Sequence, residues 1–267
     1  MFPVVEVFGK ESGLYGIMAA LGLLVCGFSG WFISRKRLNL DITDYIVYLV
    51  VIVLGIAIGG KLMYFITHTG ELFEMISDGR LAMMDFSGFF NYFFGGNVFY
   101  GGFIGACLAL IIYSRFTQKR VTVNTLETGE ALDLFACFTP LFHVFGRIGC
   151  FFGGCCYGIE STFGFTVHGN TLNPLINDVN RFPVQLLEAA CNLVIFALIL
   201  GLYLKKKMQN RCIYIYMIIY GFVRFGTEFF RGDEIRGFLW ILSTSQWVSL
   251  GLIIFAIVKL ITYGSRN

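Results

Sequence analysis

The residue types best suited to chemistry are concentrated between His143 and Gly158, in the run HVFGRIGCFFGGCCYG. If residues 141–151 are helical, His143 and Arg147 lie four residues apart and share one face of the helix. An arginine can hold phosphate oxygens through two parallel hydrogen bonds, and glycines let the backbone approach a ligand closely. The run therefore predicts a binding site for a phosphate-bearing group. Its glycines are Gly146, Gly149, Gly153, Gly154 and Gly158.

A second group of charged residues lies in the run GFVRFGTEFFRGDE. Arg224, Glu228 and Arg231 are separated by four and three residues, which predicts that they share one helical face. Two cations that share one carboxylate leave a net positive site, which suits an anionic ligand. The alternative is a salt bridge that only stabilises a helix bundle, with Arg231 at the water boundary.

Polar side chains also lie beside glycines at two other places, where one apolar run ends and the next begins. The residues are Gly59, Gly60, Lys61 and Tyr64 in the first place, and Phe99, Tyr100, Gly101 and Gly102 in the second. They are candidates for substrate binding or catalysis. The alternative is that the glycines allow close helix packing and the tyrosines anchor the membrane interface.

The thiols of Cys150, Cys155 and Cys156 admit three interpretations. A zinc site is a poor match, because it usually needs paired C-x-x-C spacings or clear histidine partners. A disulfide at an oxidising face is the second interpretation. Packing of small residues in a crowded glycine turn is the third. We adopt the packing interpretation and expect neither a metal nor a cofactor.

Composition identifies an integral membrane protein. Mean hydropathy is +0.73, and 57% of residues are hydrophobic while 14% are charged, against roughly 25% charged in a typical soluble domain. An arginine at membrane depth indicates a functional site, although Arg147 at a helix end could also extend to the interface. We expect no removable signal peptide and no nucleic-acid partner.

Seven apolar runs reach the roughly 20 residues needed to cross a membrane. They predict an all-α membrane protein. The runs are 13–33, 45–67, 98–116, 132–152, 182–204, 212–230 and 244–263.

The basic residues between these runs predict how the chain is oriented. Twelve of them fall on one side of the membrane if there are seven spans. Because Lys and Arg are enriched in cytoplasmic loops, the N-terminus is predicted outside and the C-terminus in the cytoplasm. The twelve are Arg35, Lys36, Arg37, Arg115, Lys119, Arg120, Lys205, Lys206, Lys207, Arg211, Lys259 and Arg266.

Two outward segments are longer than simple connections. Residues 68–97 mix acidic and aromatic side chains and are predicted to form an arm that lies in the membrane interface. Residues 157–181 contain the run HGNTLNPLIND, which predicts turns in a small head. Neither a repeat nor a low-complexity linker divides the chain, so residues 1–267 are predicted to form a single domain.

Taken together, the motifs resemble those of the bacterial prolipoprotein diacylglyceryl transferase family. The matching pieces follow the family's order through most of the chain. They are LYGIM at 14–18, GGKLMY at 59–64, FYGGFIG at 99–105, GRIGCFFGGCCYG at 146–158, RFPVQLLEA at 181–189 and YGFVRFGTEFFR at 220–231.

The resemblance implies a seven-span inner-membrane enzyme with its N-terminus outside. Its substrates would be phosphatidylglycerol and the lipobox cysteine in the signal peptide of a prolipoprotein. The cysteine thiol would take the diacylglyceryl group as a thioether while glycerol phosphate leaves. The family's functional residues correspond here to Tyr15, Arg147, Gly158, Tyr220, Arg224, Glu228 and Arg231.

The chain departs from the family signature, which usually continues G-N-F-x-N-G-E. Cys150 and Cys155 stand at the first asparagine and at the glutamate, and Tyr100 replaces a common histidine. Tyr100 or His143 could assist loss of the acceptor proton, while Arg147 and Arg224 clamp the phosphate. The alternatives are a related transferase with another lipid or acceptor, a membrane thiol-redox protein that uses the three cysteines, or a lipid-binding or lipid-transport protein.

Overall fold

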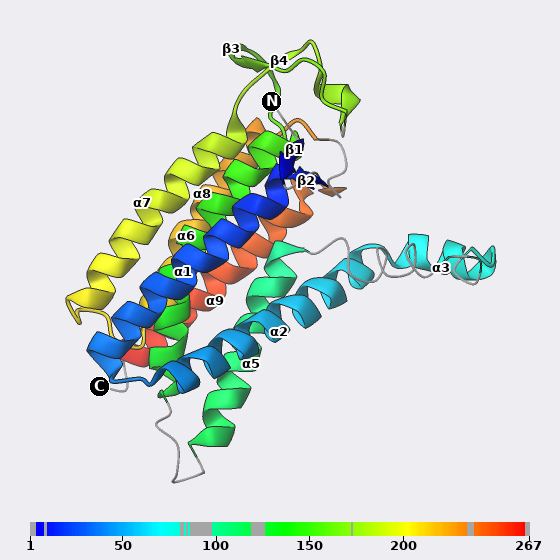
Figure 1. The fold of residues 1–267 in the computed structure, drawn as a ribbon. Helices are drawn as coiled ribbons and strands as arrows, with labels where there is room; N and C mark the ends of the chain where they lie inside the picture. The colour runs from blue at the N-terminus through cyan, green and yellow to red at the C-terminus, as the bar shows by residue number, and fades with distance from the viewer. Residues whose placement is uncertain are drawn as a thin grey trace. The chain divides into compact units, whose positions relative to one another are not determined.

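The computed structural model describes residues 4–7, 10–80, 83, 85, 98–118, 126–171, 173–233 and 238–264. Seven helices in these ranges are long and apolar enough to cross a membrane, which confirms the predicted fold class. They are α1 (Leu14–Leu38), α2 (Ile42–Thr67), α5 (Phe99–Thr117), α6 (Thr128–Gly153), α7 (Val184–Leu204), α8 (Cys212–Thr227, continued by the 3-10 helix η2 to Phe230) and α9 (Thr244–Gly264). Figure 1 labels them.

The chain divides into two compact units, which we describe separately. The first unit is Met1–Phe32 with Asp133–Asn267, and the second is Ile33–Leu132. Helices α1 and α6 therefore each contribute residues to both units. The single-domain organisation remains a prediction.

In the first unit, α8 packs against both α7 and α9. Helix α1 approaches α6 closely at Gly22, because a side chain there would collide with Phe142 and Phe145. The buried carboxylate of Asp133 accepts a hydrogen bond from the backbone N–H of Ile213 at 3.2 Å. This contact connects α6 to the N-terminus of α8, where unpaired N–H groups favour an anion.

The predicted head is a short β-structure rather than a set of isolated turns. Strands β3 (Glu160–Thr166) and β4 (Asn180–Arg181) pair antiparallel, with the 3-10 helix η1 (Pro174–Ile176) between them. Two more small hairpins precede helices: β1 (Val4–Val7) with β2 (Lys10–Gly13) before α1, and β5 (Phe238–Leu239) with β6 (Leu242–Ser243) before α9. The chain is therefore mostly rather than entirely helical.

In the second unit, α2 and α5 pack along each other through glycines spaced four residues apart on both helices. Added side chains at Gly55 and Gly59 would meet the backbone of Gly105 and Gly101, and the reverse also holds. Such pairs let helix backbones approach closely in a membrane. The arm begins with helix α3 (Thr69–Ser77), and residues 86–97 of the predicted arm lie outside the described residues.

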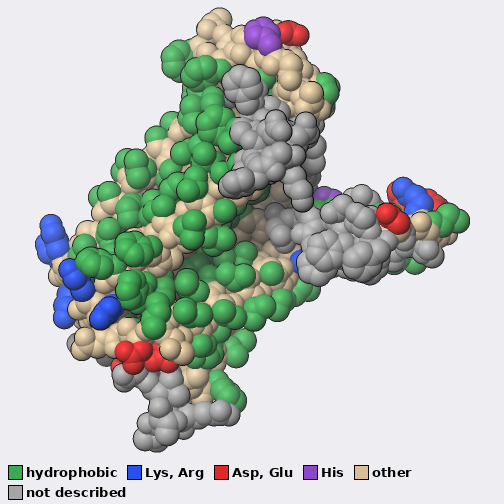
Figure 2. Space-filling view, in the orientation of Figure 1, with side chains coloured by type: hydrophobic (Ala, Val, Ile, Leu, Met, Phe, Trp, Pro, Cys, Tyr) green, Lys and Arg blue, Asp and Glu red, His purple; other side chains and the backbone are tan. Residues whose placement is uncertain are grey.

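The outer surfaces of the spanning helices are apolar. Figure 2 shows hydrophobic side chains over the sides of the helices, and Lys and Arg side chains near their ends. In α7 and α9 the exposed large side chains include Leu193, Leu198, Ile254 and Val258. Lipid tails are as apolar as these side chains, so this surface fits a membrane.

Candidate functional site

The centre of the candidate site is a buried carboxylate, Glu188 of α7, that contacts two arginines from neighbouring helices. Its Oε2 lies 2.5 Å from Nε of Arg147 on α6, and its Oε1 accepts a hydrogen bond from Nη1 of Arg224 on α8 at 3.4 Å. The three side chains are at most 10% exposed. Glu188 thus joins the arginines that the sequence singled out separately.

Arg224 is held by further contacts. Its Nη2 lies 2.7 Å from Oε2 of Glu228, one helical turn on, and donates to Oγ of Ser245 on α9 at 3.2 Å. Thr227 donates to Glu188 at 3.2 Å. We call Arg147, Glu188, Arg224 and Glu228 the arginine cluster. Its two guanidiniums face two carboxylates, so it is formally neutral, unlike the net positive site expected from Arg224, Glu228 and Arg231.

Arg147 is less fully engaged than Arg224. Within the described part of the chain its ion-pair partner is Glu188, and its two terminal Nη nitrogens have no hydrogen-bond partner there. Arg147 therefore presents a two-donor fork of the geometry that holds phosphate oxygens.

The predicted pairing of His143 with Arg147 on one helical face is confirmed, because both lie on α6 and both are buried. The His143 ring lies 5.3 Å from the ring of Tyr220, which in turn stacks on Tyr216 at 5.6 Å. His143 also lies within electrostatic range of Arg147 and Arg224. The histidine and Tyr220 therefore belong to the surroundings of the arginine cluster.

Tyr15 reaches the same region from the first turn of α1. It packs on α6 at Gly149, where an added Cβ would lie 3.1 Å from Cδ2 of Tyr15. Tyr15 is 52% exposed and within electrostatic range of Arg147 and the three thiols. Gly149 consequently has a packing function, and its predicted contact with substrate remains untested.

Arg231 is not on the helical face that the sequence predicted, because α8 ends at Thr227 and a 3-10 turn follows. Its side chain pairs with Asp233, with Nε 2.9 Å from Oδ1. Burial alone would lower the pKa of the Arg231 guanidinium, but the hydrogen bonds and charge of Asp233 outweigh burial and raise that pKa above its ordinary value. The carboxylate of Glu228 instead pairs with Arg224.

Gly158, which ends the signature, brings three backbone segments together. It bridges to Arg231, while the neighbouring Ile159 donates to the carbonyl of Phe230 at 3.0 Å and accepts from the N–H of Phe182 at 2.9 Å. A side chain at Gly158 would collide with the carbonyl groups of Phe182 and Phe230. The glycine is therefore required for backbone packing beside Arg231.

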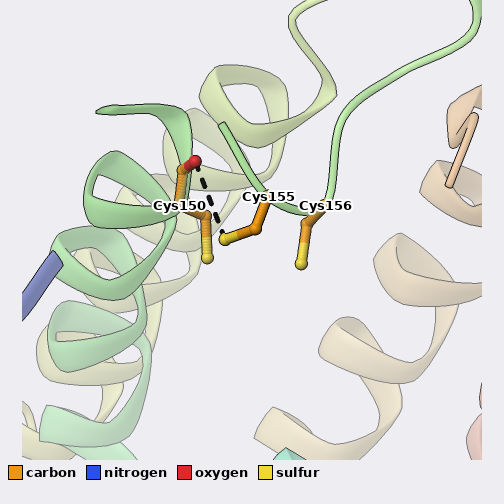
Figure 3. Close-up of side chains that lie close together, drawn as sticks. All are labelled: Cys150, Cys155 and Cys156. Carbon is orange, nitrogen blue, oxygen red and sulfur yellow. Dashed lines mark hydrogen bonds between the residues drawn. The ribbon is translucent and has the colours of Figure 1, made fainter. Parts of the chain in front are cut away.

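The three thiols lie together at the C-terminal end of α6, as Figure 3 shows. We call residues 150–156 the cysteine turn. Hydrogen bonds from the thiols of Cys150 and Cys155 lower the pKa of Cys156 well below its ordinary value, against the effect of burial. For Cys155, the hydrogen bond with Cys150 lowers the pKa, but contact with Cys156 and burial raise it to about 11 overall. The two neighbouring thiols therefore favour the thiolate form of Cys156.

The remaining predicted residues belong to the second unit. Lys61 of α2 lies over the ring of Tyr64, 4.3 Å from its centroid, in a cation–π contact. Tyr100 is buried, and the neighbouring glycines Gly101 and Gly102 both face α2 closely. The two glycines thus allow α5 to pack closely against α2. Contact of these four residues with substrate stays a prediction.

Sequence reasoning did not select Glu188, the residue that holds the site together. Glu188 could have been identified from the sequence, because an ionisable residue inside a predicted membrane span is a candidate functional residue by default. Glu188 lies in the predicted fifth span, within the run RFPVQLLEA. Asp233, Thr227 and Ser245 were also missed, since nothing in their spacing distinguishes them from ordinary loop and helix-end residues.

The fold and the arginine cluster define a multi-pass membrane protein with a buried arginine–carboxylate site. The family model described as prolipoprotein diacylglyceryl transferase matches residues 4–262, and the chain belongs to this family. The resemblance read from the motifs is thereby confirmed, and so is the assignment as a transferase.

Curated relatives match over nearly the full length of this chain. The phosphatidylglycerol–prolipoprotein diacylglyceryl transferase 2 of Clostridium perfringens is 32% identical in an alignment of 267 positions that covers 95% of this chain and 91% of the relative. The corresponding transferase of Clostridium tetani is 32% identical over 96% of both chains. That of Campylobacter hominis is 30% identical over 96% of this chain and 89% of the relative.

Proposed function

We propose that this chain transfers the diacylglyceryl group of phosphatidylglycerol to the lipobox cysteine of prolipoproteins. The thiolate sulfur attacks the glyceryl carbon that carries the phosphate ester, and a carbon–sulfur bond forms. The carbon–oxygen bond to the phosphate breaks, and glycerol phosphate leaves with its electron pair. Family membership and the full-length relatives support these substrates.

The mechanism rests on one observation, which is that the buried carboxylate of Glu188 contacts both Arg147 and Arg224. The Nη fork of Arg147 holds two phosphate oxygens, and Arg224 adds a second positive charge close by. Charge grows on the phosphate oxygen as the carbon–oxygen bond breaks. Fixed donors in a water-poor site stabilise such charge strongly, so the two arginines lower the barrier.

We assign roles in this step to the other candidate residues as well. The lipobox thiol has an ordinary pKa near 8.5 and must lose its proton before it attacks. We assign the base to His143, which lies one helical turn from Arg147, or to Tyr100. We assign headgroup contacts to Tyr15, Tyr220 and Arg231, and further substrate contacts to Lys61, Gly101, Gly102, Gly149 and Gly158.

We further propose that the chain lies in the bacterial inner membrane with its N-terminus outside. The last turn of α1 carries Arg35, Lys36 and Arg37, and Arg115 closes α5. Lys205 follows α7. In a seven-span chain these ends share one side, and their basic residues favour the cytoplasm.

Reporter fusions test this orientation. Fusions at Lys36, at Lys119, which lies outside the described residues, and at Lys206 are expected to report the cytoplasm. Fusions at Arg80 and at Leu175, which is 76% exposed in the head, are expected to report the outside. A single loop on the opposite side from its expected one would contradict the orientation.

The activity itself is tested by complementation of a strain depleted of its own transferase. The chain is expected to restore lipidation of a reporter precursor, seen as incorporation of labelled diacylglycerol at the lipobox cysteine. A precursor with serine at that cysteine is the matched control and should stay unlabelled. Absence of label with the protein present in the membrane would overturn the proposed function.

A further inference from the structure

Three cysteine sulfurs converge at the end of α6. The Sγ atoms of Cys150, Cys155 and Cys156 all lie within 4.8 Å of one another. Figure 3 shows Cys150 on the last turn of the helix, with the other two on the segment that follows. The Cys155 thiol also donates to the backbone carbonyl of Cys150 at 3.8 Å, drawn as the dashed line. Within the described residues, no histidine or carboxylate joins this group.

The backbone of the cysteine turn is fixed by its neighbours. Gln185 of α7 donates to the carbonyl of Cys155 at 3.0 Å, and Asn173 of the head donates to the carbonyl of Gly154 at 3.0 Å. Cys156 has φ of +53°, a left-handed conformation that costs a residue with a side chain about 1–2 kcal/mol. Such strain persists where the surrounding structure imposes it. Here the strained residue is one of the three cysteines whose sulfurs lie close together.

We propose that Cys150, Cys155 and Cys156 bind one thiophilic metal ion, such as Zn²⁺, Cd²⁺ or Cu⁺, through three thiolates. The ion binds three thiolates, so each thiol that still carries a proton releases it to solvent, and the complex with a divalent ion has one net negative charge. Three thiolate ligands leave a fourth position open, as in zinc sites that keep a water or substrate position. The ligand atoms that the described residues supply are all sulfur, which favours soft ions over Mg²⁺ or Ca²⁺.

The surroundings suit such a complex. Arg147 and Arg231 both lie within electrostatic range of Cys156, and their positive charges oppose the negative charge of three thiolates. Cys155 is exposed while Cys150 is buried, so an ion can enter from the Cys155 side. A disulfide would use two of the three sulfurs and would need an oxidant, whereas an ion uses all three.

Titration of the full-length, detergent-solubilised chain with Cd²⁺ tests the proposal. The protein is reduced with a phosphine and kept free of oxygen. We expect one Cd²⁺ per chain, a sulfur-to-cadmium charge-transfer absorption of three thiolates, and release of protons on binding. Changing Cys155→Ser should weaken binding by on the order of 100-fold and remove one third of the absorption, since even outer-shell changes lower metal affinity by about 10–100-fold.

Cys191→Ser is the matched control, because Cys191 is partly buried in the same unit but outside the group. It should bind Cd²⁺ like the parent chain. Thermal unfolding without metal shows whether each variant folds, and Cys156→Ser provides a second test if Cys155→Ser does not. Equal affinity of the Cys155 and Cys191 variants, absorption from fewer than three thiolates, or failure of the reduced parent chain to bind would each overturn the proposal.

Discussion

Changing Arg147→Ala is expected to lower the rate of diacylglyceryl transfer by on the order of 100-fold or more. That factor corresponds to a loss of about 3 kcal/mol in transition-state stabilisation, the size seen when a donor to a developing oxyanion is removed. Arg224→Ala should lower the rate by a similar factor. The measurement is transfer of labelled diacylglyceryl to a lipobox peptide, with equal amounts of folded protein in the membrane.

Lysine substitutions separate a phosphate clamp from a structural arginine. The Nη nitrogens of Arg147 form a planar fork, and the ammonium of lysine is a point charge that cannot reproduce it. Arg147→Lys should therefore restore only part of the lost rate. Arg80→Lys is the matched control, because Arg80 is 55% exposed in its pair with Asp78 and should tolerate lysine. Near-normal turnover for Arg147→Lys and Arg224→Lys together would remove the phosphate clamp from the mechanism.

The seven helices could be predicted because the signal for each is local. Each span is a run of about 20 apolar residues, and its length alone meets the thickness of the membrane. The observed helices begin or end a few residues away from the predicted spans where polar residues continue the helix. Helix α6, for example, begins at Thr128 rather than at residue 132 and has Glu130 in its first turn.

The site could be predicted only in part, because its contacts join distant segments. Arg147 and Arg224 were found from neighbouring residues, whereas Glu188 contacts Arg224 across 36 positions of sequence. Arg231 was misplaced for a related reason. Helical spacing holds only while the helix continues, and α8 ends at Thr227 before Arg231 is reached.

The cysteines show a different limit of sequence reasoning. Their spacing lacks the paired pattern of zinc sites, so metal binding was not expected. The left-handed backbone at Cys156 and the last turn of α6 bring the sulfurs together in spite of that spacing. Sequence spacings such as C-x-x-C identify only the common types of metal site. An irregular turn can bring cysteine sulfurs together without such a spacing.

Changing Glu188→Gln is expected to lower transfer by on the order of 100-fold or more, comparable to loss of either arginine. Removing one partner of a buried ion pair leaves the remaining charge uncompensated, so the guanidiniums are no longer held in the position that the phosphate requires. Here one carboxylate contacts two guanidiniums, so both Arg147 and Arg224 lose a partner. Glutamine keeps the size of the side chain, and the backbone carbonyl at 188 keeps its hydrogen bond from Asn192.

Glu188 acts on the reaction through the arginines, as a positioning residue, and coupling between variants tests this. Each single variant retains a fraction of the parent rate. The double variant Glu188→Gln with Arg147→Ala should retain more than the product of those two fractions, because the effects of contacting residues in one network are not additive. Glu160→Gln is the control, because Glu160 is 73% exposed in its pair with Arg181 and such pairs contribute about 0–1 kcal/mol. If Glu188→Gln turns over normally at equal folded protein while Arg147→Ala does not, then Arg147 holds the phosphate without help from the carboxylate. Strictly additive effects in the double variant would show that Glu188 affects the rate independently of Arg147, and would overturn its role as a positioning residue.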